Sequence, residues 1–319
     1  MMIDVSEHHA SIVRRPLSHA LRSRVMTSQF AFCPSSIVIR HSSMRCSIDR
    51  TSVTPVASTR ASRSRSSRAL ITATASHATS HATLVKICGI TSTTDCALAC
   101  EAGADFIGMI MSSKSKRRVT KEDAKAIAST AKTRGVNPVL VFVDEDARTI
   151  VEACDYVGCE YAQLHGDGAR RALETLPMRV KAIYVLEASE DGRVMTKLPG
   201  DEEKLIAQRR EAMSGEQGWR AAVDFVNGPR RVVDYLLIDG VRAGSGVAFN
   251  WRNLKPPRGA SRKGWFLAGG LTPENVAEAI DAAHPTGVDV ASGVADASGV
   301  AKDEGKMKAF ATNAKATKA

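Results

Sequence analysis

The sequence predicts an α/β protein, a single-domain (β/α)8 barrel (TIM barrel) preceded by a disordered N-terminal leader. Three observations predict it: the composition changes near residue 80, eight short strand-like runs follow, and helices or sufficiently long segments separate those runs. Neighbouring parallel strands need a crossover connection, which is usually a helix. Eight such units in about 235 residues match the size of a (β/α)8 barrel.

Residues 1–80 differ in composition from the rest of the chain. They hold 11 arginines, no lysine and three acidic residues, a net charge of +8, together with 18 serines. They also lack sustained apolar periodicity. An Arg-rich, Ser-rich and acid-poor N-terminus is typical of an organelle transit peptide. We therefore expect a disordered transit peptide here, with a merely disordered basic tail as the alternative.

The remaining residues are nearly neutral, with 33 basic against 31 acidic side chains, a net charge of +2. A duplex-binding protein concentrates Lys and Arg on its folded surface, so this balance argues against a nucleic-acid partner. No apolar run reaches the roughly 18 residues that a membrane-spanning helix needs. We expect neither nucleic-acid nor membrane binding.

Cysteine usage argues against both a disulfide framework and a metal site. Five cysteines follow the leader, an odd number at irregular spacing. Cys96 and Cys100 are four residues apart on a helical stretch, but the histidines of the expected barrel, His165 and His284, are far apart in sequence. The pair is therefore interpreted as helix packing. No metal and no cofactor are predicted.

The strand-like runs are short, apolar and rich in β-branched residues, as in strands that are buried on both faces. The first, LVKIC, ends in Cys88. The expected strands are 84–88, 105–111, 138–143, 161–166, 180–186, 233–239, 264–270 and 287–293. A doubly wound open sheet could also hold this many units, but it predicts a GxGxxG turn after the first strand, and CGITST lacks it.

Helical stretches connect most of these runs. The expected helices are 94–104, 121–135, 147–154, 168–176, 272–283 and 302–310. The segment at about 187–233 is longer than a crossover requires, and its DEEKLIAQRREAM is typical of an exposed charged helix. We expect a surface insertion there, with no assigned role, within a catalytic barrel that spans 84–316.

Polar groups and glycines gather where the expected strands end. In a barrel, working residues lie at the carboxyl ends of the strands and in the loops that follow. A lone cysteine usually packs and a lone aspartate usually caps a helix, but the whole set predicts one shared pocket. The set comprises Cys88, Gln163 and His165 in QLHG, Asp239, the AGG that ends the seventh strand and the ASG that ends the eighth.

Six segments of the chain stand out, in this order: KICGIT, SKRRV, QLHG, LLIDGVRAGSGVAFNW, LAGGLTPENV and GVDVASGV. In these segments and their order, over about residues 84–313, the chain resembles the phosphoribosylanthranilate isomerase family. The resemblance implies an Amadori rearrangement of N-(5-phosphoribosyl)anthranilate without a cofactor, with Asp239 as the acid and Cys88 as the base. It is strongest to plant and algal forms, which favours the plastid stroma over the mitochondrion.

The resemblance also implies how the substrate is bound. Arg117 of SKRRV stands where the family carries an arginine for the anthranilate carboxylate, and the adjacent Arg118 or a merely solvated charge run are the alternatives. Backbone N–H groups of glycine turns suit a phosphate because they add no bulk. The expected substrate-binding residues are Arg117, Gln163, His165, Gly244, Ser245, Gly246, Gly269, Gly270, Ser292 and Gly293.

The pKa values of the acid and the base must be shifted in opposite directions for both groups to act near neutral pH. A thiol titrates near 8.5 and a carboxyl near 3.9, so burial must raise the pKa of Asp239, while a nearby cation or helix N-terminus must lower that of Cys88. Lys86, two residues before Cys88, points to the same barrel face. It leaves open a related barrel enzyme, an indole-glycerol-phosphate synthase or sugar-phosphate epimerase. A non-catalytic phosphate-binding barrel is the other alternative, and the expected assembly is a monomer or homodimer.

Overall fold

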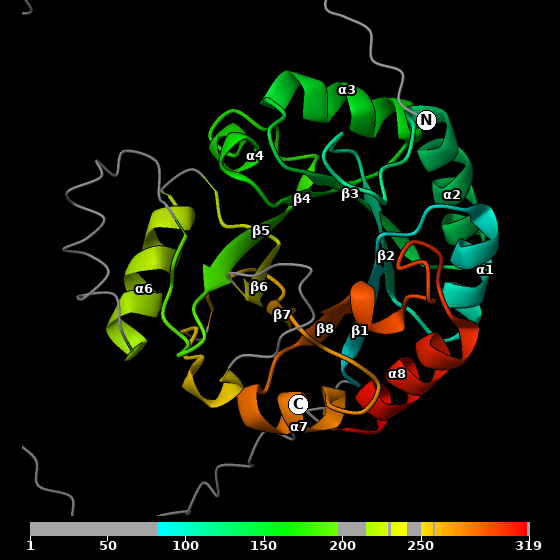
Figure 1. Ribbon diagram of the computed structural model, residues 1–319. Helices are drawn as coiled ribbons and strands as arrows, with labels where there is room; N and C mark the ends of the chain where they lie inside the picture. The colour runs from blue at the N-terminus through cyan, green and yellow to red at the C-terminus, as the bar shows by residue number, and fades with distance from the viewer. Residues whose placement is uncertain (1–81, 197–214, 229–230, 241–249, 258, 318–319) are drawn as a thin grey trace, which may run out of the picture. The chain divides into compact units, whose positions relative to one another are not determined.

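The computed structural model describes residues 82–196, 215–228, 231–240, 250–257 and 259–317. The expected transit peptide, residues 1–80, therefore lies outside the described residues. Eight parallel strands form a closed barrel in chain order, and β1 pairs with β8 to close it. Helices lie around this ring of strands (Figure 1). The predicted (β/α)8 barrel is confirmed.

Each of the eight expected strands is present, within a few residues of its predicted ends. The strands are β1 Leu84–Cys88, β2 Phe106–Ile110, β3 Asn137–Phe142, β4 Tyr161–Leu164, β5 Lys181–Ala188, β6 Tyr235–Gly240, β7 Trp265–Leu267 and β8 Gly287–Val290. All eight are largely buried, as their apolar composition predicts, because the barrel interior covers one face and the helices cover the other.

The helices of the described residues begin at side-chain caps in several cases. Ser92, Thr120, Asp146 and Asp303 each accept a hydrogen bond from a backbone N–H in the first turn. The helices are α1 Thr93–Glu101, α2 Lys121–Thr133, α3 Ala147–Val157, α4 Asp167–Ala172, α6 Gly215–Val226, α7 Val276–Ala283 and α8 Glu304–Ala316, with 3-10 turns η1 Trp251–Asn253 and η2 Ser292–Val294.

The segment expected to be a surface insertion, about 187–233, is partly regular barrel structure. Glu187 and Ala188 end strand β5, and α6 buries Trp219 completely. The Trp219 Nε1 donates a hydrogen bond to the Gly192 carbonyl oxygen at 3.2 Å. This part of the range is a packed element because α6 is amphipathic. The charged DEEKLIAQRREAM stretch lies outside the described residues.

An apolar layer fills the amino-terminal half of the barrel interior. Its aromatic centre is Phe106, whose ring lies edge-on to Tyr161, Tyr235 and Phe266, with centroids 5.4, 5.7 and 5.5 Å away. The layer consists of Phe106, Val139, Tyr161, Ile183, Val185, Tyr235, Leu237, Phe266 and Ala268. Because inward positions alternate along a strand, the next inward residues toward the carboxyl ends lie above this layer.

Within the part of the chain that the structure describes, no helix combines the length and apolarity needed to cross a membrane.

Candidate active site

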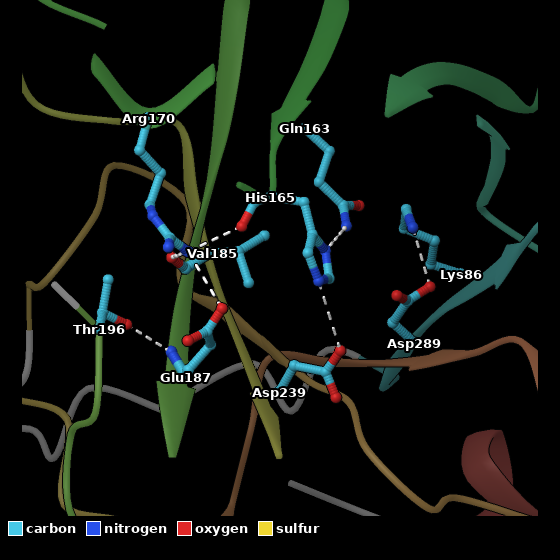
Figure 2. Close-up of polar contacts among 9 residues, drawn as sticks. All are labelled: Lys86, Gln163, His165, Arg170, Val185, Glu187, Thr196, Asp239 and Asp289. Atoms are coloured by element: carbon cyan, nitrogen blue, oxygen red, sulfur yellow. Dashed lines mark hydrogen bonds and ion pairs between the residues drawn. The ribbon is translucent and has the colours of Figure 1, made fainter. Parts of the chain in front are cut away.

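The predicted acid and base both lie at the carboxyl ends of strands. Cys88 is the last residue of β1, and Asp239 precedes the last residue of β6. Both are buried, at 6% and 8% exposed. Lys86 and Asp289 interact electrostatically with both of them, so the two groups border one polar region above the aromatic layer. Figure 2 shows Asp239 among Lys86, Gln163, His165 and Asp289.

Gly108 of β2 makes the room that Cys88 occupies. The two residues are register partners across the β1–β2 pair. A Cβ atom on Gly108 would lie 2.7 Å from the Cys88 Sγ and 3.1 Å from the Lys86 Nζ. Only a residue without a side chain fits here, and the same measurement shows that the Cys88 sulfur and the Lys86 ammonium are close neighbours. Sequence reasoning missed Gly108, although it occupies an inward position of its strand.

Lys86 forms a buried ion pair with Asp289. The Lys86 Nζ lies 2.8 Å from the Asp289 Oδ1, and the two residues are opposite each other in the β1–β8 ladder. The Lys86 side chain is completely buried. Burial alone would lower the pKa of Lys86, but Asp289 and the sulfur of Cys88 outweigh it and raise this pKa. Asp289 was missed as a site residue, although it lies two residues after Gly287 of β8, whose Cβ position faces the Phe266 ring in the barrel interior.

The balance of forces on Cys88 differs from the sequence expectation. Burial raises the pKa of the Cys88 thiol, against the lowering effects of the Lys86 and Lys302 ammonium groups, and Asp289 adds to the increase. The expected cations are therefore present, but desolvation is the larger effect. A thiol whose pKa is raised is in its thiolate form in only a small fraction of the molecules near neutral pH.

The pKa of Asp239 is raised, in the direction expected from the sequence. Burial, then the nearby Asp289 and Glu187, raise its pKa to about 7, although the Gly240 N–H and Lys86 oppose this. Among the described residues, its buried Oδ1 has no hydrogen-bond partner. A carboxyl group with this pKa holds its proton through a large part of the neutral range and can give it up there.

His165 and Gln163 lie beside the acid. The Gln163 Nε2 is 3.3 Å from the His165 Nδ1, and the His165 Nε2 is 3.9 Å from the Asp239 Oδ2 (Figure 2). Burial, with help from Arg170 and Lys86, lowers the pKa of His165 to about 4, so the imidazole is neutral at pH 7. With the Gln163 amide donating to Nδ1, the imidazole proton is on Nε2 and points toward Asp239.

Arg170 of α4 connects His165 with the end of β5. Its Nη1 donates to the His165 carbonyl oxygen at 2.7 Å and lies 3.4 Å from the Glu187 Oε1. The Thr196 hydroxyl oxygen in turn accepts a hydrogen bond from the Glu187 backbone N–H. These contacts tie the loop after β4 to the end of β5. Sequence reasoning assigned no role to Arg170 or Glu187.

Of the two adjacent arginines, Arg117 is buried and Arg118 is exposed. A Cβ on Gly89, whose φ is +75°, would lie 2.7 Å from the Arg117 Cδ, so this side chain crosses over the residue that follows Cys88. The Arg117 Nε is buried and has no hydrogen-bond partner among the described residues. Of the two arginines, Arg117 is therefore the one that packs next to the end of β1.

The glycine turns after β7 and β8 lie against one another. Gly269 and Gly270 have φ angles of 88° and 67°, in the region that favours glycine. A Cβ on Gly293 would lie only 2.0 Å from the Leu271 carbonyl oxygen, and Ser292 begins the turn η2 beside it. Four of the expected phosphate-binding residues are thus together. The other three, Gly244, Ser245 and Gly246, lie outside the described residues.

Lys302 is a further buried cation that sequence reasoning missed. Its Nζ donates to the Ala291 carbonyl oxygen at 2.8 Å. Burial and the neighbouring Arg117 lower the pKa of Lys302 to about 8, although Cys88, Asp289 and Asp95 oppose this. Nothing in its local sequence, a loop before α8, distinguishes it from a solvated lysine.

Comparison with known proteins identifies the chain. Residues 85–217 and 219–313 match the family model of N-(5'phosphoribosyl)anthranilate (PRA) isomerase. N-(5'-phosphoribosyl)anthranilate isomerase 1, chloroplastic, of Arabidopsis thaliana is 41% identical over 229 residues, which are 72% of this chain and 74% of that protein. The Chlamydia felis isomerase is 36% identical over 231 residues, 72% of this chain and 96% of its own.

Solved structures of isomerases of this family also resemble the chain. The crystal structure of the isomerase from Thermotoga maritima is 32% identical and superposes with a TM-score of 0.58, covering 73% of this chain and 99% of its own. A second isomerase structure, in complex with reduced 1-(O-carboxyphenylamino)-1-deoxyribulose 5-phosphate, is 31% identical with a TM-score of 0.54 and the same coverage. With the family model, these matches show that the chain belongs to the N-(5'-phosphoribosyl)anthranilate isomerases, enzymes of tryptophan biosynthesis.

Proposed function

We propose that this isomerase rearranges N-(5'-phosphoribosyl)anthranilate with Asp239 as general acid and Cys88 as general base. Asp239 protonates the furanose ring oxygen as its bond to C1 of the sugar breaks, which leaves an iminium group between C1 and the anthranilate nitrogen. The Cys88 thiolate removes the proton from C2, and the electron pair moves into the C1–C2 bond. The resulting enolamine takes up a proton at C1 and loses the C2 hydroxyl proton, which gives the ketose with no net change in atoms.

The observation that carries this proposal is that Lys86 and Asp289 act on both Cys88 and Asp239. The two reacting groups share these neighbours across the barrel, as an acid and a base on one ribose require. The surroundings of Asp239 also favour a protonated carboxyl, and the cations near Cys88 favour an ionised thiol. Asp239 has a carboxyl pKa of about 7, and Cys88 has two ammonium groups within electrostatic range.

The ends of the substrate have separate sites in this proposal. The Arg117 guanidinium binds the anthranilate carboxylate, for which its unpartnered Nε is free among the described residues. Backbone N–H groups around Gly269, Gly270, Ser292 and Gly293 bind the phosphate, with Gly244, Ser245 and Gly246 as the remaining lining. Gln163 and His165 contact the sugar beside Asp239. No cofactor takes part.

The test is the loss of substrate fluorescence with Cys88→Ser and Asp239→Asn. General acid or base catalysis contributes about 10² to 10⁴ per group, so each variant should remain folded and lose about two orders of magnitude or more in turnover. Cys154→Ser, a buried cysteine of α3 away from the strand ends, is the matched control and should keep its activity. Near-normal turnover in Cys88→Ser or Asp239→Asn would remove that residue from the mechanism.

The alternatives are tested by the same assay. A sugar-phosphate epimerase or indole-glycerol-phosphate synthase activity would appear with its own substrate and not with phosphoribosylanthranilate. A phosphate-binding barrel without activity would bind the substrate and release it unchanged. Complementation of a tryptophan auxotroph that lacks the isomerase, with residues 82–319, gives an independent answer.

We also propose that residues 1–80 direct the protein to the plastid stroma. Two supports are the Arg-rich, acid-poor composition and the Arabidopsis relatives, whose names describe them as chloroplastic. A fluorescent protein fused behind residues 1–80 should accumulate in plastids of plant cells. Accumulation in mitochondria or in the cytosol would contradict this assignment.

For assembly, the proposal is a monomer or a homodimer. One Thermotoga maritima structure is described as monomers of a dimeric phosphoribosylanthranilate isomerase. Sedimentation of the full chain at several concentrations distinguishes the two states, and a larger assembly would contradict both.

A further inference from the structure

Lys86 is a buried cation that the acid and base roles do not use. Its side chain is 0% exposed, among the largest fully buried side chains of the described residues. A buried ammonium is costly unless charged and hydrogen-bonding partners surround it. Its position, two residues before Cys88 on the inward face of β1, places those partners inside the active site.

The Lys86 ammonium has three N–H donors and two nearby acceptors of different kinds. Asp289 Oδ1 accepts one hydrogen bond at 2.8 Å. The second acceptor is the Cys88 sulfur, and the two atoms flank the point where a Gly108 Cβ would lie, at 2.7 Å for Sγ and 3.1 Å for Nζ. Lys86 therefore joins the carboxylate of β8 to the thiol of β1.

The charges that face Cys88 leave room for one more anion. Lys86 comes from β1, Asp289 from β8 and Lys302 from the loop before α8, and the Arg117 side chain crosses over Gly89. Two ammonium groups thus act on Cys88 against one carboxylate. Ionisation of the thiol would add the second negative charge, in direct contact with an ammonium that is already held in place by Asp289.

We propose that Lys86 is the positioning residue that stabilises the Cys88 thiolate, and that Asp289 is the counter-ion that holds Lys86 in place. This inference rests on the proposed role of Cys88 as the base. It also separates the two aspartates of the site. Asp289 is committed to the ion pair with Lys86, whereas Asp239 has no lysine or arginine within ion-pair distance among the described residues and is the one available as an acid.

The first experiment measures the thiol itself. The ultraviolet absorbance of the thiolate, titrated with pH and corrected with Cys88→Ser, follows Cys88 separately from the other cysteines. In Lys86→Met the Cys88 titration should move to higher pH by one unit or more, which lowers the thiolate fraction at neutral pH about tenfold or more. Lys86→Arg keeps a cation at this position and should restore part of the shift.

One control tests whether the loss of any lysine shifts the Cys88 titration, and a second variant allows for destabilisation of the fold. Lys263→Met removes a lysine whose Nζ contacts the Tyr161 hydroxyl at 3.1 Å, in the aromatic layer below the site, and should leave the titration unchanged. Removing Lys86 alone leaves Asp289 buried without a partner, which can destabilise the fold. Lys86→Met combined with Asp289→Asn removes both charges. Its Cys88 titration should still lie above that of the wild type, because the ammonium acts on the thiol more strongly than Asp289 does.

The two proposals can fail independently. If Cys88 titrates identically in the wild type, in Lys86→Met and in the double variant, the positioning role is wrong whatever the enzyme activity. If the titration shifts but Cys88→Ser retains near-normal turnover, Lys86 stabilises a thiolate that is not the base. Support for both requires the titration shift together with a matching movement of the alkaline limb of kcat/KM.

Discussion

The His165 Nε2, just after β4, lies 3.9 Å from the Asp239 Oδ2 near the carboxyl end of β6, and the imidazole of this pair is neutral. A protonated histidine at that distance would lower the carboxyl pKa and remove the acid at neutral pH. Because burial keeps His165 uncharged, Asp239 retains the pKa of about 7 that burial and its acidic neighbours produce.

The pH profile of kcat/KM should be bell-shaped, with the general acid responsible for its rising limb and the general base for its falling limb. The active form has Asp239 protonated and Cys88 ionised, yet the acid has the lower pKa of the two. The rising limb near pH 7 therefore reports Asp239, and the falling limb at alkaline pH reports Cys88, as apparent values of the coupled pair. Initial rates from pH 5 to 10 check this, and a rising limb that persists above pH 8 would assign it to another group.

Glu187→Gln should move the rising limb to lower pH. Glu187 raises the pKa of Asp239, after the larger effects of burial and Asp289, and the amide removes its charge. A lower pKa leaves less of the acid protonated, so the maximal kcat/KM should also fall, by less than about tenfold. Glu160→Gln, which removes a carboxylate paired with Lys181 near the amino ends of the strands, is the control. A rising limb unchanged by Glu187→Gln would exclude this contribution.

Gly108→Ala should disable the enzyme while leaving it folded. The new methyl group would lie 2.7 Å from the Cys88 Sγ and must displace it. Misplacing a catalytic group by about 1 Å can cost about 10² in rate, and overpacking costs about 1–3 kcal/mol of stability. Gly228→Ala, at a position with no atom within 4 Å of the new Cβ, should change neither kcat nor Tm. Unaltered turnover in Gly108→Ala would show that the thiol has more freedom than the packing indicates.

Arg117→Ala should raise KM with a modest loss of kcat, whereas Arg118→Ala should change little. Arg117 is buried beside Gly89, and Arg118 is exposed. Loss of a hydrogen bond to a charged group costs about 1.5–3 kcal/mol, which predicts a KM increase of roughly 10- to 100-fold. Steady-state kinetics of the two variants side by side provide the measurement. Equal effects of both substitutions would point to a general loss of positive charge.

His165 should destabilise the folded protein as the pH drops from about 6.5 toward 4, whereas Asp239, whose pKa is raised to about 7, contributes with the opposite sign over the same interval. The His165 pKa is lowered to about 4 in the folded protein, against 6.5 in the unfolded chain, so the unfolded state takes up the proton first. The difference between the two pKa values corresponds to a loss of unfolding free energy on the order of 2 kcal/mol from His165, and solvent screens it little because the side chain is only 24% exposed. Denaturant unfolding at pH 7 and pH 4.5 measures it. The pH dependence of the unfolding free energy of His165→Asn should lack this loss when it is compared with that of the wild type, and an identical pH dependence in both proteins would exclude the contribution of His165.

The sequence determined the architecture because the barrel is built from local signals. The β-branched runs such as LVKIC and the helical stretches between most of them predicted all eight strands within a few residues. The alternation of inward positions also placed Cys88 and Lys86 on one face. Six short segments in order predicted the family, which the comparisons confirm. The site roles of Cys88, Asp239 and Arg117 remain predictions.

Only the tertiary structure decided which charges meet. Lys86 and Asp289 are more than 200 residues apart in the chain and become neighbours when β8 closes the barrel against β1. The space for the Cys88 sulfur depends on Gly108 of the next strand, and the contact between the two glycine turns depends on the packing of Gly293 against Leu271. Residue types and periodicity specify the strands and the faces that their side chains occupy. The pKa of Asp239 and of Cys88 depends on burial and on all the charged groups around each of them, which come from several strands.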